Sequence, residues 1–339
     1  MTPMNGWIDR IVGWLCAPVL NLADPLRRIY WLYLLSALAI AGAVFVYRRR
    51  VRGRALLQGF FTYVAPWQVF GHRSARLDYW FFYLNTVLFG LILAPLVAAP
   101  TVATFVAHSL GVSASAPASA GPWWSLGMTI ATLLAMDLAL YIGHYLQHRV
   151  PFLWEFHKVH HSAEVLTPIT AFRVHPVDDL LTLSLTALFS GVVQGLFHAT
   201  VGTGIADIEV LGVNAPLFAW YIFGFHLRHS HIWLAYPVWL SHILVSPAQH
   251  QIHHSSAPRH FDRNMGFIFA FWDAIGGTLY VPKAREDLTY GLYGEEPGQF
   301  ASVSALYIRP FRNLWAMRSR GASQDRIMPP TAAVRRPSV

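Results

Sequence analysis

The stretch at residues 141–175 reads YIGHYLQHRVPFLWEFHKVHHSAEVLTPITAFRVH and holds six of the chain's 17 histidines. Five of these six stand one, three or four residues apart, and a similar motif follows further along the chain. Residues three and four apart share one face of a helix, so each motif directs two or three imidazoles toward one place. Neutral imidazole is the commonest metal-ligating side chain, and three such motifs predict a site for two metal ions. The motifs are His144-x-x-x-His148, His157-x-x-His160-His161 and His250-x-x-His253-His254.

A purely structural role for histidine has to be weighed against metal binding. An isolated histidine on an apolar helix is more often a packed residue than a ligand. This interpretation fails for the three motifs, because imidazoles brought together without a metal repel each other when protonated and lack donors when neutral. All-nitrogen sites suit iron, zinc, copper or nickel, so the motifs alone leave the metal open. We give the structural interpretation to His72, His108, His198, His242 and His260.

The composition indicates an integral membrane protein. Of the 339 residues, 55% are hydrophobic and only 12% are charged, whereas soluble domains average about 25% charged residues. The single cysteine, Cys16, excludes an intramolecular disulfide and a cysteine-ligated zinc or iron–sulfur site. The formal net charge of +8 comes without a basic stripe interleaved with aromatic residues. The excess of arginine therefore indicates membrane orientation, and we expect no nucleic-acid partner.

The apolar stretches predict five crossings of the bilayer, whose hydrocarbon core takes a helix of about 20 residues. Five arginines lie between Arg48 and Arg54, directly after the first stretch, and arginine-rich ends stay in the cytoplasm. We therefore expect the N-terminus outside and all three histidine motifs on the cytoplasmic side. The predicted fold class is an all-α integral membrane helical bundle with a cytoplasmic, histidine-rich metal-binding cap. The stretches are 29–47, 79–108, 123–141 and the hairpin 180–225, which crosses outward over 180–200 and returns over 208–225.

The sequence predicts that the chain is divided into four parts. Residues 1–28 mix tryptophan and charge with apolar residues, which is typical of an interfacial amphipathic segment. Residues 29–122 are predicted to form an N-terminal transmembrane region, and residues 123–290 the domain that holds the three histidine motifs. Residues 291–339 form a cytoplasmic C-terminal region, and its Arg-, Pro- and Ser-rich end from Arg318 onward is predicted to be disordered.

The order of the motifs resembles the fatty acid hydroxylase and sterol desaturase superfamily of membrane-bound diiron oxygenases. The resemblance covers roughly Asp137 to Thr278, and the combined spacing makes it specific. The motifs that carry it are HYLQH, FHKVHH, FRVHP, RHSH, PAQHQIHH and NMGFIFAFWDAIGGT.

The resemblance implies a ligand set that includes all eight motif histidines. A further ligand usually stands in a His-Ser-Asn pattern, which here reads His229-Ser230-His231. The ninth ligand is therefore open between His229, the first choice, and His226. We expect His175 at the edge of the site, and Asp137 and Asp273 to hold ligating rings by hydrogen bonds or to form salt bridges with arginines. The eight are His144, His148, His157, His160, His161, His250, His253 and His254.

The resemblance further implies two iron ions, with zinc able to substitute, and O₂ as cosubstrate. The substrate is expected to be a lipid or a sterol-like molecule in the bilayer; hydroxylation, desaturation and ether cleavage are not distinguished. No haem-binding His-Pro-Gly-Gly run and no GxGxxG occurs, so we expect a separate electron donor such as a ferredoxin. The expected location is the bacterial inner membrane, or the endoplasmic reticulum in a eukaryote. The alternatives are a divalent-metal transporter and a metal-stabilised scaffold without oxygenase activity.

Overall fold

The structure is a computed structural model that describes residues 5–49, 54–92, 99–111, 121–295 and 298–319. Within these ranges the chain consists of helices and loops with one small hairpin, which confirms the predicted all-α architecture. The longer helices are α1 (Asn5–Leu20), α2 (Trp31–Arg49), α3 (Arg54–Val64), α5 (Arg73–Ile92), α6 (Ala99–Ser109), α7 (Pro122–Arg149), α8 (Pro151–His161), α9 (Pro176–Val201) and α14 (Val303–Ser319). The short helices are α4 (Trp67–Phe70), α10 (Ala215–Ile222), α11 (Val238–Ser241), α12 (Pro247–His253) and α13 (Phe271–Gly276). The 3₁₀ turns and strands are η1 (Asn21–Ala23), η2 (Pro168–Phe172), η3 (Phe225–Arg228), η4 (Pro258–His260), β1 (Glu209–Val210) and β2 (Val213–Asn214).

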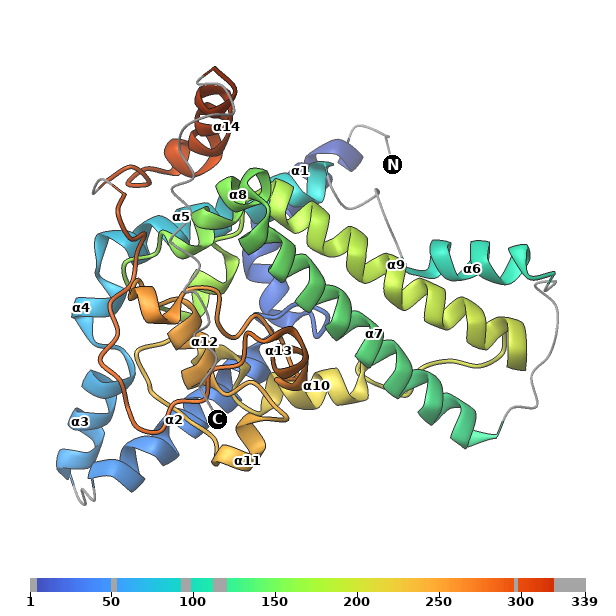
Figure 1. The fold of residues 1–339 in the computed structure, drawn as a ribbon, viewed down its shortest axis with the longest axis horizontal. Coiled ribbons are helices and arrows are strands. Elements are labelled where there is room, and N and C mark those ends of the chain that lie inside the picture. Colours follow the sequence, from blue (N-terminus) through green and yellow to red (C-terminus); the bar gives the residue numbers. More distant parts are fainter. Residues whose placement is uncertain (1–4, 50–53, 93–98, 112–120, 296–297, 320–339) are drawn as a thin grey trace, which may run out of the picture.

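Helices α6, α7 and α9 form an arm that extends from one side of the molecule (Figure 1). Helix α9 packs against both α6 and α7. Its close approach to α6 depends on Gly191 and Gly195, where an added Cβ would come within 2.5 Å of Val102 Cβ and 2.7 Å of Val106 Cβ. Small residues four apart let helices approach closely where water does not drive their association. The arm is therefore packed in the manner of membrane helices.

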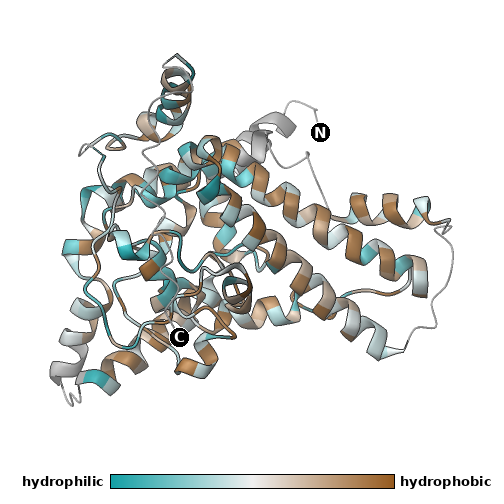
Figure 2. Ribbon diagram, viewed as in Figure 1, coloured by the Kyte–Doolittle hydropathy of each residue, from teal (hydrophilic) through white to brown (hydrophobic). Residues whose placement is uncertain are grey.

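Three described helices, α2, α7 and α9, are long and apolar enough to cross a membrane by length and composition. Figure 2 shows apolar residues along most of the arm, whereas hydrophilic residues are concentrated in the rest of the molecule. Only 22% of the apolar window of α2 and of α9 is buried, so most of their apolar side chains are free to contact lipid. The chain is an integral membrane protein, as its composition indicates.

Two of the predicted crossings differ from the structure. The stretch 79–108 is divided between α5 and α6, and residues 93–98 lie outside the described chain. The predicted return crossing at 208–225 is wrong. It consists of the antiparallel strands β1 and β2 followed by α10, whose eight residues reach only about 12 Å, well short of the bilayer core of about 30 Å. The turn at Leu211 and Gly212, with φ of 53° and 78°, reverses the chain where a straight helix was expected.

The remaining helices form a cap at the base of the arm. Helix α2 lies along this cap, with Ala37 and Ala41 packed against Leu227 and Ile232. Helix α14 contacts α8 and α5, where Leu306 packs in a cluster with Phe81, Val159 and Phe300. Residues 298–319 are therefore joined to the cap by packing. The predicted disordered tail begins at Arg318, but Arg318 and Ser319 belong to α14, and residues 320–339 lie outside the described chain.

Candidate metal centre

Local sequence signals bring the first two histidine motifs together. Helix α7 ends at Arg149, because the residue before a proline is driven out of the helical region; Val150 accordingly has φ −97° and ψ 115°. Pro151 then opens α8 at its first position, where its missing N–H costs no hydrogen bond. The tight turn sets α8 against the end of α7. The HYLQH and FHKVHH motifs consequently face each other.

The third motif is positioned by a capped short helix. Ser246 caps α12, its side chain accepting from Gln249 N while the Gln249 side chain accepts from Ser246 N. Pro247 occupies the first turn, as in α8. Helix α12 carries His250 and His253, and His254 closes it.

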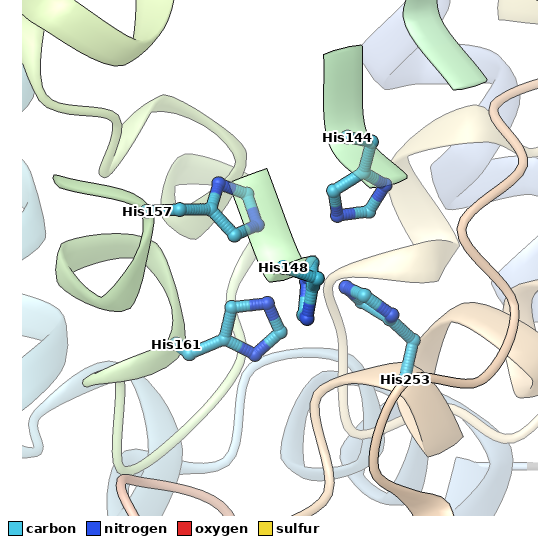
Figure 3. A group of neighbouring side chains, drawn as sticks. All are labelled: His144, His148, His157, His161 and His253. Atoms are coloured by element: carbon cyan, nitrogen blue, oxygen red, sulfur yellow. The ribbon is translucent and has the colours of Figure 1, made fainter. Parts of the chain in front are cut away.

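Five histidines form the first group. Their ligand atoms all lie within 4.8 Å of one another, and Figure 3 shows the rings converging from α7, α8 and α12. The Nε2 atoms of His148, His157 and His161 are buried with no hydrogen-bond partner in the described part of the chain, and so is that of His253. Buried nitrogen atoms are rarely left unpaired in a native protein. A cation between the rings would satisfy them. The group is His144, His148, His157, His161 and His253.

Four histidines form the second group, and their Nε2 atoms lie close together. His229 Nε2 lies 3.3 Å from His160 Nε2, 3.1 Å from His254 Nε2 and 3.0 Å from His250 Nε2. A neutral imidazole carries only one N–H, so hydrogen bonds cannot satisfy all of these contacts. An ion bound about 2.0–2.1 Å from each nitrogen would set neighbouring ligand atoms about 3.0–3.4 Å apart. The observed spacing fits that arrangement.

The electrostatics keep the ligands in the form that a metal needs. Burial is the main cause that lowers the pKa of His160, His161 and His254 well below the usual value, and neighbouring imidazoles lower it further. Burial likewise lowers the pKa of His229 and His250. For His253 burial lowers the pKa to about 3. These imidazoles are therefore neutral at pH 7 and able to bind a cation.

Hydrogen bonds behind the first group fix which nitrogen faces its centre. His144 Nδ1 lies 2.7 Å from Met265 O, and His253 Nδ1 lies 2.8 Å from Arg263 O. A carbonyl oxygen only accepts, so Nδ1 carries the proton and the Nε2 lone pair faces the centre of the group. His157 Nδ1 lies 2.8 Å from Asp178 Oδ2, which fixes that ring in the same way.

Asp178 was not identified from the sequence. It lies in the first turn of α9 and is 4% exposed. Its carboxylate also accepts from Gln147 Nε2, which lies 3.2 Å from Thr182 Oγ1 as well. One feature of the sequence could have identified Asp178: it is a carboxylate at the start of an apolar helix, and a charge that is buried there needs a partner.

The predicted roles of Asp137 and Asp273 need correction, because neither carboxylate hydrogen-bonds a histidine or an arginine in the described chain. Asp137 accepts from Ile268 N, Phe269 N and Trp272 Nε1 at 2.7, 3.0 and 3.1 Å. Asp273 accepts from Met265 N at 2.7 Å, Gly266 N at 2.9 Å and Thr278 Oγ1 at 2.6 Å. Both carboxylates satisfy backbone donors in the segment after the third motif. Asp273 affects His144 indirectly, by holding Met265.

The structure separates the two candidates for the ninth ligand. His229 belongs to the second group, whereas His226 belongs to neither group. His226 Nε2 instead lies 2.6 Å from Arg28 O. His175 is also outside both groups; it caps α9, accepting from Val177 N at Nδ1, and its Nε2 lies 3.2 Å from Tyr307 O. The chain thus brings together nine of the ten predicted ligands.

Comparisons with known proteins agree with this geometry. A sequence model of the fatty acid hydroxylase family matches residues 129–278. Alkylglycerol monooxygenase from Caenorhabditis elegans is 26% identical over 57% of this chain and 34% of that protein. Ornithine lipid hydroxylase OlsE from Rhizobium tropici is 26% identical over 51% of this chain and 48% of that protein. Human cholesterol 25-hydroxylase is 31% identical over 43% of this chain and 49% of that protein.

The chain spans about a third to a half of the length of these curated relatives. No solved structure matches it. The matched segment contains all three motifs and His229, and it ends at Thr278 after the NMGFIFAFWDAIGGT run. The spacing of the motifs, their convergence into two groups and the family match lead to one conclusion: residues 129–278 of this chain are similar to the fatty acid hydroxylase family.

Proposed function

We propose that this protein is a diiron oxygenase that inserts one oxygen atom of O₂ into a C–H bond of a membrane lipid. The observation that carries the proposal is the division of nine imidazoles, seven of them from buried residues, into two adjoining groups. The rings of His161 and His254, one from each group, have centroids only 4.7 Å apart. Two metal ions held there would be near neighbours, and four-fold ligation in the second group leaves room for further ligands.

The reaction balances as RH + O₂ + 2 e⁻ + 2 H⁺ → ROH + H₂O. Two bound ferrous ions would supply the electrons that activate O₂. The chain's own residues hold the ions, fix the ring orientations through Asp178, Met265 O and Arg263 O, and exclude water. The ligands are well suited to exclusion, because the exposed fractions of His253 and His254 are 4% and 2%.

The substrate class is proposed to be a lipid with a saturated chain or a sterol-like body. Three relatives are named for the oxidation of an alkylglycerol, an ornithine lipid and cholesterol. The apolar surfaces of α2 and α9 let such a molecule approach the cap from the bilayer. Electrons are proposed to come from a separate donor protein, and the metal centre to lie on the cytoplasmic side because of the arginines that follow α2.

A transporter for divalent metals is the weaker alternative. Transport needs ligands distributed along a path through the membrane. His144 and His148 instead lie at one end of α7, and the other seven histidines lie in the cap beyond it. This clustering favours a fixed catalytic site.

The test compares lipids from cells that make the wild-type protein with those from cells that make His254→Ala, under labelled O₂. We expect a lipid carrying one labelled oxygen in the wild-type cells and none in the variant. His108→Ala is the matched control, because His108 lies on α6 and belongs to neither group. Equal labelled product from His254→Ala, at equal protein level in the membrane, would refute the oxygenase proposal.

A further inference from the structure

The proposed metal ligands of the first group contact two kinds of residue: some are fully buried, and others belong to a partly exposed loop. Met265 and Asp178, which contact His144 and His157, are 1% and 4% exposed. The contacts of His253 and His148 lead instead to a partly exposed loop, residues 258–264. Arg263 O lies 2.8 Å from His253 Nδ1, and Asp262 Oδ1 lies 3.5 Å from His148 Nδ1. This partly exposed loop therefore touches two ligands of the first group through polar contacts.

The conformation of the loop is set by its sequence. Asp262 and Asn264 both have φ of 57°, in the left-handed region that Asp and Asn tolerate better than other non-glycine residues. The two residues flank Arg263 and direct its carbonyl inward to His253. Asn264 is fully buried, donates to Gln249 O and accepts from Tyr280 N. The contact between surface and ligand is therefore rigidly built.

The outer side of the loop is basic. Arg259 has a side chain that is 62% exposed, and Arg263 extends along the surface to donate to Gly277 O. Arg149 joins them at the end of α7, 3.2 Å from Asp262. The carboxylates of Asp262 and Glu286 are paired with Arg149 and Arg259. Close to Glu286 in sequence, the two exposed cations Lys283 and Arg285 outnumber the exposed carboxylate of Asp287. The surface thus keeps a positive balance.

The position of this loop in the fold also favours a water-soluble partner. Arg149 is the last residue of α7, at the opposite end from Pro122, and α7 is the helix that leads from the arm into the cap. The loop that contacts Arg149 is therefore held away from the apolar arm. A partner that docks there approaches from water.

We propose that residues 258–264, with Arg149, form the docking surface for an acidic one-electron donor protein. The inference rests on the proposed function, which consumes two electrons in each turnover. Each docked donor would give up one electron, which would reduce one bound ferric ion to ferrous, so two encounters would restore the centre. The route runs from the docked donor through Arg263 O to His253 and through Asp262 to His148. Complementary charge on such a surface speeds encounter and makes it sensitive to salt.

The experiment uses the full-length, metal-loaded protein in detergent and a plant-type ferredoxin as the acidic probe. The variants are Arg259→Glu and the milder Arg259→Gln, at the exposed arginine of the loop that contacts no metal ligand. Arg312→Glu on the exposed face of α14 is the control, since it makes the same change in charge as Arg259→Glu away from the loop. The first measurement is the Kd of oxidised ferredoxin at low and high salt, which needs no turnover. The second is the anaerobic rate at which reduced ferredoxin is oxidised by the ferric protein.

We expect the loop variants to weaken ferredoxin binding by about tenfold at low salt and to slow ferredoxin oxidation in parallel, with less dependence on salt. Arg312→Glu should behave as wild type. Equal Kd values in loop variants and control overturn the proposal. Wild-type protein that is reduced by dithionite but not by ferredoxin overturns it too, because the partner is then not an acidic one.

A separate measurement distinguishes failure of this inference from failure of the proposed function. Wild type and loop variants are reduced anaerobically with dithionite, freed of excess reductant and mixed with lipid and O₂ for a single turnover. Equal product in all of them shows that the centre is intact and assigns the defect to donor docking. Absence of product in the wild type rejects the oxygenase itself, whatever the ferredoxin result. Loss of product in the loop variants alone shows damage to the centre and overturns docking as the cause.

Discussion

Asp178 Oδ2 lies 2.8 Å from His157 Nδ1, and both side chains are almost completely buried. A carboxylate in this position holds the imidazole proton on Nδ1 and raises the basicity of Nε2. His148 has only the longer contact to Asp262, whereas the Nδ1 atoms of His160, His229 and His250 have no partner in the described residues. The first group is therefore the better supported of the two.

Replacing Asp178 with asparagine tests this support. An amide cannot stabilise a ligating imidazole as a carboxylate does, so we expect the affinity of one metal ion to fall by about 10- to 100-fold. Elemental analysis after dialysis against a graded chelator should show one ion lost early and one retained. Asp179→Asn is the matched control, because Asp179 is the next residue and its carboxylate makes no hydrogen bond to a histidine in the described chain. Loss of both ions together, or of neither, contradicts the assignment.

The histidines were predictable because their chemistry is local. Motif spacing identified eight histidines that the structure brings together, and the His-Ser pattern favoured His229. The supporting groups were not predictable, because they depend on tertiary contacts: Asp178 comes from α9, and Arg263 contributes its backbone carbonyl rather than its side chain. Asp137 and Asp273 illustrate the same limit. Their carboxylates satisfy backbone amides, which a sequence pattern does not distinguish from imidazoles.

The fold was predictable where hydropathy dominates, as in α2, α7 and α9. The fold was not predictable where the backbone conformation of individual residues determines the course of the chain. The apolar run at 208–225 has the composition of a membrane helix, but the turn at Leu211 and Gly212 pairs β1 with β2. Asn214 then caps α10, accepting from Leu217 N, and Gly224, with φ of 94°, lies just beyond its end. The conformation of this segment therefore depends on the capping of α10 and on the pairing of β1 with β2.

The buried ligands predict that the metal-free fold loses stability in mild acid. Imidazoles in the unfolded chain have a pKa near 6.5, whereas burial lowers that of His253 to about 3. Below pH 6.5 the unfolded state binds more protons, so stability is full above this pH and is lost as the pH falls toward the folded pKa. Each such histidine contributes about 1.4 kcal/mol per pH unit in that window. The Tm of chelator-treated protein should therefore fall steeply below pH 6.5; a flat profile would show that the rings are not buried together.

The two ends of α7 should lie on opposite sides of the membrane. Its 28 residues rise about 42 Å, enough to cross the core. A reporter at Ala116, between α6 and α7, should therefore give the opposite signal to one placed after Ser319, because α14 packs on α8 in the cap. We expect the Ala116 reporter outside the cytoplasm. The same side for both would mean that α7 does not cross.

His229 and His226 provide the sharpest test of the metal centre, since they lie three residues apart and both are buried. His229→Ala removes one of four imidazoles whose Nε2 atoms converge, so we expect one metal ion to be lost and lipid oxidation to stop. His226→Ala removes the contact to Arg28 O and the ring packing on Phe225, which should cost about 1–3 kcal/mol of stability and leave both ions bound. Metal content and Tm of each purified variant separate the two effects. If His226→Ala loses an ion while His229→Ala keeps two, the ligand assignment drawn from the second group is wrong, and the site must be rebuilt around His226.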